Sequence, residues 1–394
     1  MPSTALVLDL TRLASRAGRT RTGVDRVERA WLEACLADPR PVFGLLRTPI
    51  GFALFDRSGM ARFAAASDTD DWGAPGAVAE LFRRLDPPRR AAQGHVRRLA
   101  LARSSRPGLG RMLRRHLPSG ALYLNTGHAD LDAAVMQAMR GAEARIAVLI
   151  HDTIPLDLPW AAGPGTVRRF AERLSVAARH ADRVITTAGA TAADIEGHLR
   201  RLGRVPEMVV APLGVTPASP DRTALPPDLD LLRPYMLALG TIEPRKNHAL
   251  LLDVWERLGP EAPQLLICGA RGWNNAAVFE RLDRGVPRVT ELSGLTDGAI
   301  AALIEDARAL LFPSLAEGYG LPPLEALSLG CPVVCSDLAI ARELMGGRAV
   351  YCAPTDRYQW EQAVRALALP GAARPPRLSP PGWEAHVARA LAGL

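Results

Sequence analysis

Lysine is almost absent from this sequence of 394 residues. A single lysine, Lys246, stands among 48 Lys and Arg side chains. We interpret the strong preference for arginine, together with abundant alanine, as codon bias from a GC-rich genome, so the arginines as a group indicate no function. Lys246 is the exception to that bias, which makes its position informative.

Cysteine and long hydrophobic runs are also scarce. The five cysteines are scattered and none has the C-x-x-C spacing of a zinc site, so we expect all five to be reduced residues of the interior. No run approaches the roughly 18 apolar residues of a membrane-spanning helix. Asp9 interrupts the stretch where a secretory signal would need its apolar region. We therefore expect a cytoplasmic protein whose mature chain begins at or near Met1.

Acidic residues are missing from one segment. Residues 82–116 hold eleven arginines and one acid, Asp86, a net charge of +10 in a chain whose total is +7. Such a local charge predicts a docking surface for an anion, either phospholipid headgroups or a lipid-linked diphosphate, with a solvated helical face as the alternative. Phe82 is the only aromatic residue in the segment, so bases would find no stacking platform, and we do not expect nucleic-acid binding.

Short apolar runs alternate with amphipathic segments along the whole chain. Continuous apolar runs are typical of parallel strands that are covered on both faces, and the alternation is that of a doubly wound α/β fold. The predicted strands are residues 4–11, 41–47, 121–126, 145–152, 183–188 and 207–214, and then 235–240, 263–269, 288–294, 307–312 and 331–336.

Proline divides this pattern into two domains. We predict a first Rossmann-like domain over residues 1–216, a Pro-rich linker over 217–234 and a second Rossmann-like domain over 235–374. A terminal helix within 375–394 is expected to cross back and pack on the first domain. Ligands should bind in the cleft between the facing domains, at the carboxyl ends of the strands.

The single lysine lies directly after one of these strands. The strand at 235–240 leads through the turn "TIEPRKN" into a helix predicted to begin near Asn247, a residue type that favours the N-cap. Arg245 and Lys246 are therefore adjacent at a strand end and just before a helix N-terminus. Because a helix N-terminus attracts anions, two added cations there predict a diphosphate site.

A second group of polar residues follows the strand at 307–312, in "AEGYGLPPLEA". Gly318 and Gly320 would let the backbone approach a ligand closely, and the N–H groups around Gly320 and Leu321 could hold phosphate oxygens. Glu317 lies in the loop, whereas Glu325 lies one turn into the following helix. The two carboxylates can meet one ligand only if the loop folds back over the start of that helix.

The sequence resembles a known family at this point. "GTIEPRKN" followed by "FPSLAEGYGLPPLEALSLGCPVVCSD" is similar to the signature of retaining glycosyltransferase family 4, with its E-x7-E motif. The resemblance covers the second domain closely, and "RGWNN" at 271–275 is similar to mannosyltransferase-like bacterial members. It implies the GT-B fold, in which two Rossmann-like domains face each other across a cleft. In the first domain the resemblance is looser, and it does not extend over residues 57–119.

The resemblance implies roles for the second-domain residues. Arg245 and Lys246 would bind the donor diphosphate and neutralise its charge as the nucleotide leaves. Glu317 would contact hydroxyls of the transferred sugar, and Glu325 would hold the ribose. The backbone from Gly318 through Gly320 to Leu321 would help to hold the sugar and the distal phosphate.

The resemblance also implies roles in the first domain. His151 would face the donor sugar, with a satisfied core histidine as the alternative. The neighbouring Asp152 would orient the loop, with a role as a base as the alternative. Thr22 and Gly23 would belong to a loop that closes over the phosphates and the acceptor. The paired glycines that often occur in that loop are replaced here by "AGRTRTGV".

The implied reaction transfers a sugar with retention at the anomeric carbon, through front-face substitution, and needs no metal or other cofactor. Asp68 and Asp70 do form a D-x-D pair, but the polar loop that carries it belongs to the wrong architecture for a metal site. The implied substrates are a nucleotide sugar, with GDP-mannose favoured, and a glycan or lipid-linked acceptor in the synthesis of cell-surface polysaccharide. A peripheral position on an anionic membrane would follow from the arginine cluster. The alternatives are a nucleotide-sugar epimerase of the same fold and a non-catalytic protein that binds polyanions.

Overall fold

The first domain is built on a mainly parallel sheet. The structure is a computed structural model that describes residues 4–19, 21–231 and 234–394. In this domain the strands are arranged in the order β4-β3-β2-β1-β5-β6-β7-β8. The strands are β1 (Leu6–Asp9), β2 (Val42–Thr48), β3 (Gly51–Phe55), β4 (Ala102–Ser104), β5 (Leu122–Asn125), β6 (Arg145–Leu149), β7 (Arg183–Thr186) and β8 (Glu207–Val210).

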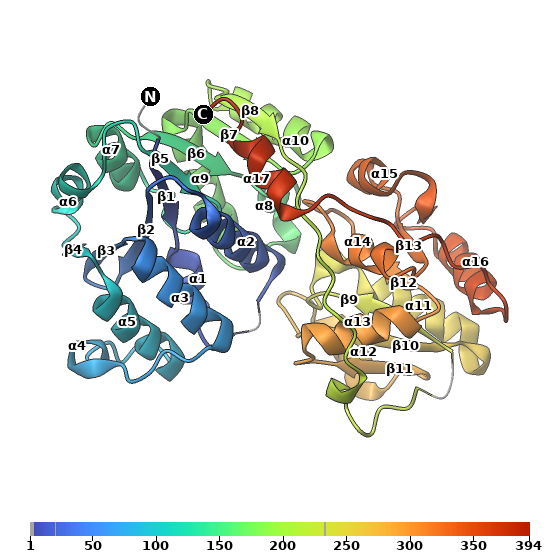
Figure 1. Cartoon of the computed structure of the whole chain (residues 1–394). Helices are drawn as coiled ribbons and strands as arrows, with labels where there is room; N and C mark the ends of the chain where they lie inside the picture. Colours follow the sequence, from blue (N-terminus) through green and yellow to red (C-terminus); the bar gives the residue numbers. More distant parts are fainter. Residues whose placement is uncertain (1–3, 20, 232–233) are drawn as a thin grey trace.

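Helices connect these strands and cover the sheet (Figure 1). Their bounds are α1 (Thr11–Ser15), α2 (Gly23–Ala37), α3 (Arg57–Thr69), α4 (Gly76–Glu80), α5 (Pro87–Leu99), α6 (Leu109–His116), α7 (Ala133–Gly141), α8 (Ile154–Asp157), the 3-10 turn η1 (Pro159–Ala161), α9 (Thr166–His180) and α10 (Gly189–Arg201). The arginine-rich segment supplies α5 and α6 and the short strand β4 between them.

The six strands predicted for this domain are present, but β3 and β4 were not predicted. Both pair antiparallel, β3 with β2 and β4 with β3, so the edge of the sheet departs from the purely parallel layout that we expected. Strand β3 directly follows β2 in a hairpin, whereas β4 has only three residues and pairs with β3 from a distant part of the sequence. Gly51 begins β3 with φ of 148°, and a Cβ there would lie 1.9 Å from the carbonyl oxygen of Ser104. The close approach of β4 thus requires glycine at position 51.

The second domain has a sheet in which every described pairing is parallel, in the order β11-β10-β9-β12-β13-β14. Its strands are β9 (Tyr235–Leu239), β10 (Gln264–Cys268), β11 (Val289–Leu292), β12 (Leu310–Phe312), β13 (Val333–Ser336) and β14 (Val350–Cys352), of which β14 was not predicted. Its helices are η3 (Pro244–Lys246), α11 (His248–Leu258), η4 (Gly259–Glu261), α12 (Ala276–Arg284), α13 (Asp297–Asp306), α14 (Leu321–Ser328), α15 (Ala339–Met345), η5 (Gly346–Arg348) and α16 (Arg357–Ala368).

Buried apolar side chains form three clusters. One lies on a single face of the first sheet, another on a single face of the second, and the third is continuous from the first domain into the second. All five cysteines are free and buried, as expected for packing residues. Among the described helices, none has both the length and the apolar character needed to cross a membrane.

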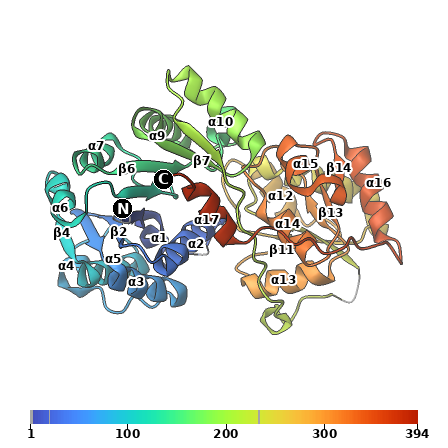
Figure 2. The same cartoon turned by 45° about the horizontal axis from the view of Figure 1, so that its top comes forward.

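The two domains are joined twice. Residues 217–231 run along the second domain with only one short turn, η2 (Arg222–Ala224), and Arg222 pairs there with Glu305 and Asp306 of α13. The chain then returns from the second domain, and its last helix, α17 (Trp383–Leu391), packs on α2 and β8 of the first (Figures 1 and 2). His386 of α17 accepts a hydrogen bond from the indole of Trp31 at 3.0 Å. The C-terminal helix is therefore an integral part of the first domain.

Candidate active site

Arg245, Lys246 and Glu317 form one charged cluster at the carboxyl edge of the second sheet. Lys246 Nζ lies 2.5 Å from Glu317 Oε1, and Arg245 Nη1 lies 2.9 Å from the same oxygen. Arg245 also donates to Glu243 at 2.7 Å through Nη2. Two of the loops singled out in the sequence, after β9 and after β12, therefore meet at one point.

The loop residues before the lysine adopt a tighter turn than expected. Residues 244–246 form the 3-10 turn η3, and α11 begins at His248 with Asn247 at its N-cap. Asn247 has φ of 54°, and its side chain does not cap the helix; it donates instead to the carbonyl of Pro354 at 3.0 Å. The predicted start of the helix is confirmed, whereas the expected capping bond is wrong because Asn247 ties the turn to a neighbouring loop.

Burial and pairing set the charges of this cluster. Burial by itself would raise the pKa of Glu317, but the charges of Arg245 and Lys246 outweigh it and lower that pKa to about 2. Burial lowers the pKa of Lys246, and Glu317 offsets only part of that effect. Burial also opposes the charge on Arg245, but Glu317 and Glu243 raise its pKa above the ordinary value. The carboxylate of Glu317 therefore stays ionised at neutral pH, and Arg245 and Lys246 share it.

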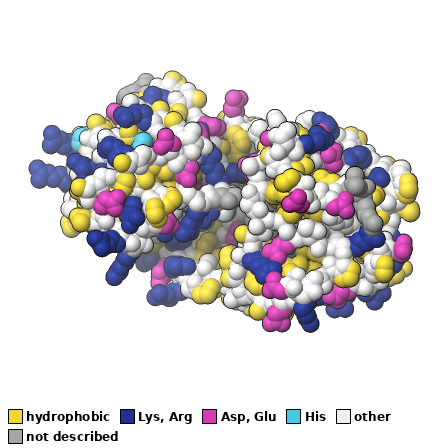
Figure 3. Space-filling model, turned by 90° about the horizontal axis from the view of Figure 1, so that it is seen from below, with side chains coloured by type: hydrophobic (Ala, Val, Ile, Leu, Met, Phe, Trp, Pro, Cys, Tyr) yellow, Lys and Arg dark blue, Asp and Glu magenta, His cyan; other side chains and the backbone are white. Residues whose placement is uncertain are grey.

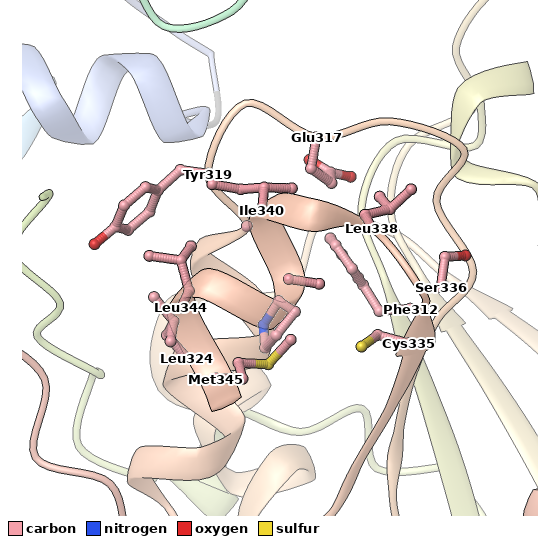
Figure 4. A pocket seen from close by; sticks show the side chains of 13 residues that line it. Phe312, Glu317, Tyr319, Leu324, Cys335, Ser336, Leu338, Ile340, Leu344 and Met345 are labelled. Atoms are coloured by element: carbon pink, nitrogen blue, oxygen red, sulfur yellow. The ribbon is translucent and has the colours of Figure 1, made fainter. Parts of the chain in front are cut away.

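Apolar side chains back this cluster. Lys246 Nζ lies 4.3 Å from the centroid of the Phe312 ring, a cation–π contact. Phe312 and Glu317 also line a cavity of about 20 Å³, whose other walls are mostly apolar residues of α14 and α15 (Figure 4). The cavity is too small for a sugar. Its mostly apolar lining gives one side of the charges a surrounding of low polarity, in which charges interact more strongly than in water.

Gly318 brings the second domain against the first. A Cβ at this position would lie 2.7 Å from the carbonyl oxygen of His151 and 2.9 Å from Oδ2 of Asp152, so only glycine fits without a shift of the backbone. The carbonyl of Gly318 accepts hydrogen bonds from Thr191 at 2.7 Å and Thr187 at 3.3 Å. The segment after β6 and the loop after β12 thus face each other across the domain interface.

His151 is a neutral hydrogen-bond donor in this structure. Its Nε2 lies 2.7 Å from the carbonyl oxygen of Thr126, and since that oxygen can only accept, Nε2 carries the proton. Burial lowers the pKa of His151 to about 4. Its ring also packs on that of His128, with 5.2 Å between the centroids. Nδ1 is left as the acceptor that a sugar hydroxyl could use.

Asp152 lies next to the cluster of Arg245, Lys246 and Glu317 and has a raised pKa. Burial raises the pKa of Asp152, and the charge of Arg245 offsets part of that rise. Its Oδ1 accepts a hydrogen bond from the backbone of Ile154 at 3.1 Å, which fixes the turn into α8. This contact agrees with the structural role that the sequence favoured for Asp152.

The start of α14 presents backbone donors to the interface. No described residue accepts a hydrogen bond from the N–H groups of Gly320 and Leu321, and two prolines follow them in the first turn. Because proline has no N–H, Gly320 and Leu321 are the donors that an anion would meet here. Gly23, with Thr22 just before α2, lies opposite; a Cβ on Gly23 would contact Leu321 at 3.7 Å.

Arg26 is a site residue to which the sequence analysis assigned no role. It reaches from α2 across the interface and donates to Glu325 at 2.6 Å and to Asp297 at 2.8 Å. Burial opposes the charge of Arg26, but Glu325 and Asp297 outweigh it and raise the pKa of Arg26. Burial raises the pKa of Glu325, and the charge of Arg26 offsets only part of that rise. Glu325, the residue expected to bind the ribose, is thus held through its Oε1 by Arg26 of the opposite domain. In the sequence, the only sign of such a role was that Arg26 carries a charge close to the start of α2.

A cavity of about 280 Å³ opens beside this pair, between the two domains. Arg21, Arg26 and Arg29 line it from the first domain and Leu321 and Glu325 from the second. Figure 3 shows the surface hollowed between the two lobes. Of the residues predicted from the sequence, Leu321 and Glu325 line this recess, whereas Glu317 and Gly320 line the smaller cavity beside Phe312.

Further bonds close the interface away from this recess. The carboxylate of Glu343 accepts from the N–H groups of Gly189 and Ala190 at the start of α10, at 2.7 and 2.8 Å. Trp273 and Asn274, in the loop "RGWNN", donate to backbone carbonyls of residues 161 and 162 at 2.9 and 3.1 Å. The sequence marked that loop only as similar to mannosyltransferase-like members, and in the structure it contacts the first domain.

The D-x-D pair has arginine and backbone partners. Asp68 accepts from Arg29 at 2.6 and 2.8 Å and from Arg21 at 2.9 Å, and Asp70 accepts from Gly18 N–H and the indole of Trp72. Within residues 4–19, 21–231 and 234–394, no three His, Cys, Asp or Glu side chains gather in a way that could hold a metal ion.

Comparison with known proteins assigns the second domain. Residues 233–369 match the family model "Glycosyl transferases group 1". The C-terminal domain is a glycosyl transferases group 1 domain. The chain is 32% identical over 243 residues to the serotype-specific mannosyltransferase WbdA of Escherichia coli, which covers 56% of this chain and 30% of WbdA. It is 36% identical over 127 residues to the O-antigen chain mannosyltransferase B of the same species, covering 31% of this chain and 33% of that protein.

The glycosyl transferases group 1 domain sits in a known two-domain architecture. The structure superposes on that of Anabaena HepE in complex with UDP with a TM-score of 0.59 at 14% identity, covering 92% of this chain and 89% of HepE. The expected GT-B fold is confirmed. The aligned regions span only about a third of the two mannosyltransferases, 30% and 33% of their lengths.

Proposed function

We propose that this protein is a retaining hexosyltransferase that moves a sugar, with mannose favoured, from a nucleoside-diphosphate sugar to a glycan or lipid-linked saccharide in the synthesis of cell-surface polysaccharide. The observation that carries the proposal is the cluster of Arg245, Lys246 and Glu317 in the glycosyl transferases group 1 domain. The loop that holds Glu317 lies against His151 and Asp152 of the first domain. The similarity to mannosyltransferases of O-antigen synthesis supports mannose and the polysaccharide product.

In this proposal the donor diphosphate binds where Arg245 and Lys246 now share Glu317. A phosphate oxygen takes over the charge of Glu317 as partner of the two cations, and the N–H groups of Gly320 and Leu321 add hydrogen bonds. Glu317 is then released toward the hydroxyls of the transferred sugar. Glu325 holds the ribose through the oxygen that Arg26 leaves open, and Thr22 and Gly23 close over the phosphates.

The proposed chemistry keeps the anomeric configuration. The bond from the anomeric carbon to the phosphate oxygen breaks as the bond from the acceptor oxygen forms on the same face, and the leaving phosphate oxygen receives the acceptor proton. His151, neutral at physiological pH because of its pKa of about 4, positions the sugar through Nδ1. The chain's own contribution is positioning and charge stabilisation at Arg245 and Lys246, with no metal or cofactor.

The donor is the first point to test. We expect the protein to release nucleoside diphosphate from one of the UDP, GDP, ADP or dTDP sugars, with GDP-mannose favoured, and to do so faster when soluble oligosaccharide acceptors are present. The product examined by NMR should keep the anomeric configuration of the donor. Conversion of the donor without any acceptor would point to the epimerase, and no turnover with any nucleotide sugar would contradict the proposal.

We further propose that the arginine cluster of residues 83–115 docks on an anionic membrane surface. Arg89 and Arg90 pair with Asp86 and Glu80, and Arg98 donates to two carbonyls, so part of the cluster is internally used. The exposed members are Arg83, Arg84, Arg98, Arg103, Arg106, Arg111, Arg114 and Arg115. Basic side chains stand at the outer edge of the first domain in Figure 3, away from the recess. A cytoplasmic protein held at the inner face of the membrane is consistent with that arrangement.

Arg111, Arg114 and Arg115 share the exposed side of α6 and make the sharpest test of membrane docking. Because a basic residue near an anionic surface contributes about 1 kcal/mol, their joint replacement by Gln should weaken binding to phosphatidylglycerol vesicles by about a hundredfold. Turnover of a soluble acceptor should not change. Arg284→Gln with Arg348→Gln, on the second domain, is the control. Equal vesicle binding by the variant, or an equal loss of soluble turnover, would refute the membrane role.

A further inference from the structure

A second cavity lies in the first domain, next to the interdomain recess. Its volume is about 240 Å³, and it is enclosed by the segment before α2 and by the end of α3 with the loop that follows. Arg21 lines both this cavity and the larger one of about 280 Å³ between the domains. The two cavities therefore lie on either side of one side chain, and a chain-like ligand could occupy both.

Asp68 fixes the arginines at this junction. Arg29 holds it with two hydrogen bonds, of 2.6 and 2.8 Å, and Arg21 adds one of 2.9 Å. The bond from Arg29 is the main cause of a lowered pKa of Asp68, so the carboxylate stays charged. The planar guanidinium groups of Arg21 and Arg29 are thereby held in place before any ligand arrives, which limits the entropy lost on binding.

The charges around the smaller cavity are balanced. Three cations face three anions: Arg16, Arg19, Arg21, Asp25, Asp68 and Asp70. A phosphate would meet as many carboxylates as guanidinium groups, so this lining does not favour an anion. A sugar hydroxyl both donates and accepts hydrogen bonds, and it is suited to a wall on which donors and acceptors alternate.

The size and the lining of the cavity suit one sugar ring. Leu13 and Trp72 supply apolar surface beside the charged groups, as the C–H faces of a sugar require. Asp70 receives the N–H of Gly18 at 3.0 Å and the indole of Trp72 at 2.6 Å on the same oxygen, Oδ1, so Oδ2 can accept from a ligand. The volume of about 240 Å³ lies below the roughly 300–1,000 Å³ of pockets for drug-sized molecules, which is the scale of a single monosaccharide unit.

We propose that this cavity is a subsite for a neutral sugar ring of the acceptor glycan, one unit away from the ring that receives the transferred hexose. The inference rests on the proposed transferase function and deepens it by naming a chemical class of acceptor. One wall, formed by Ser67, Asp68, Asp70 and Trp72, comes from α3 and the loop after it, a part of the chain that the family resemblance does not explain. In this arrangement Asp68 positions arginines and Asp70 binds the ligand, which accounts for the D-x-D spacing without a metal.

Two substitutions test the subsite while keeping the fold. Asp70→Asn preserves one oxygen for Gly18 and Trp72 but turns the ligand acceptor into a donor, and Arg19→Ala removes a side chain that is 48% exposed at the cavity. Arg200→Ala, on an arginine of α10 that is 71% exposed, is the control. The probes are neutral di- to tetrasaccharides of mannose, glucose, galactose and rhamnose, together with phosphorylated and uronate-containing counterparts, measured by saturation-transfer NMR and titration calorimetry.

We expect wild-type protein and the control to bind at least one neutral oligosaccharide, and both cavity variants to bind it at least about tenfold more weakly. Their affinity for nucleoside diphosphate should not change. Binding of no neutral oligosaccharide, equal binding by the variants, or dependence on phosphate or uronate groups would overturn the subsite. Failure of the proposed transferase function would be seen separately, as absence of donor turnover. Normal donor turnover with an unchanged acceptor KM in both variants would refute the subsite alone.

Discussion

Replacing Lys246 by arginine should lower the rate of sugar transfer at least about tenfold, although the charge is kept. The lysine stem runs beside Gly240, with its ammonium group between the Phe312 ring and Glu317. The side chain is only 11% exposed, so the larger planar guanidinium would have to displace one of these neighbours. Lys246→Ala should cost more, about 100- to 1,000-fold in kcat, as found for the loss of one transition-state donor.

Steady-state kinetics with the donor that the protein turns over would measure both effects. Arg348→Ala, an exposed cation of the same domain, is the matched control and should keep full activity. Full activity of Lys246→Arg would mean that the single lysine is a relic of codon usage. It would also remove the reason for placing the distal phosphate at this side chain.

Replacing Glu317 by glutamine should separate binding from turnover. The amide keeps the shape of the carboxylate but no longer neutralises Arg245 and Lys246, so two buried cations are left short of a partner. We expect the free energy of unfolding to fall by about 3 kcal/mol, the scale for breaking a buried ion pair. Nucleoside diphosphate should then bind more tightly than to the wild type, because it no longer competes with the carboxylate.

Turnover of Glu317→Gln should nevertheless drop about 100-fold, since the proposed contact with the sugar hydroxyls is lost. Thermal unfolding with and without nucleoside diphosphate would show the effect directly: the ligand should raise the midpoint more in the variant than in the wild type. Weaker diphosphate binding combined with normal kcat would be the opposite pattern, and it would show that Glu317 does not occupy the place of a phosphate group.

Most of the fold was predictable because most of its strands appear in the sequence as short apolar runs. Strands covered on both faces need continuous apolar runs, and these occur in the sequence from residues 4–11 to 331–336. Strand β3 has five residues, as many as β9, and its apolar run "GFALF" carries the same signal, so the sequence could have predicted it. Strand β4 has only three residues at the edge of the sheet, and only its long-range pairing with β3 defines it. Strand β14 has three residues, of which only Cys352 is buried, so it lacks the continuous apolar run that marks β12.

The candidate site was predictable only in part. Residues that follow parallel strands gather at one edge, which is why Lys246 and Glu317 could be expected to meet. The bond between Arg26 and Glu325 joins residues 299 positions apart in different domains. It depends on how the domains pack, and that packing is set by many small contacts that no local pattern encodes. The partners of Asp68 escaped for the same reason, since its arginines lie on α2 and on the segment before it.

The most direct test of this account is a calorimetric titration of GDP and UDP into the wild-type protein, Lys246→Ala and Arg348→Ala. The central claim is that the donor diphosphate binds at Arg245 and Lys246, in place of Glu317. It predicts that one of the two nucleotides binds to the wild type and to Arg348→Ala with equal affinity, and to Lys246→Ala at least about tenfold more weakly. Equal affinity of all three proteins for that nucleotide would contradict the claim.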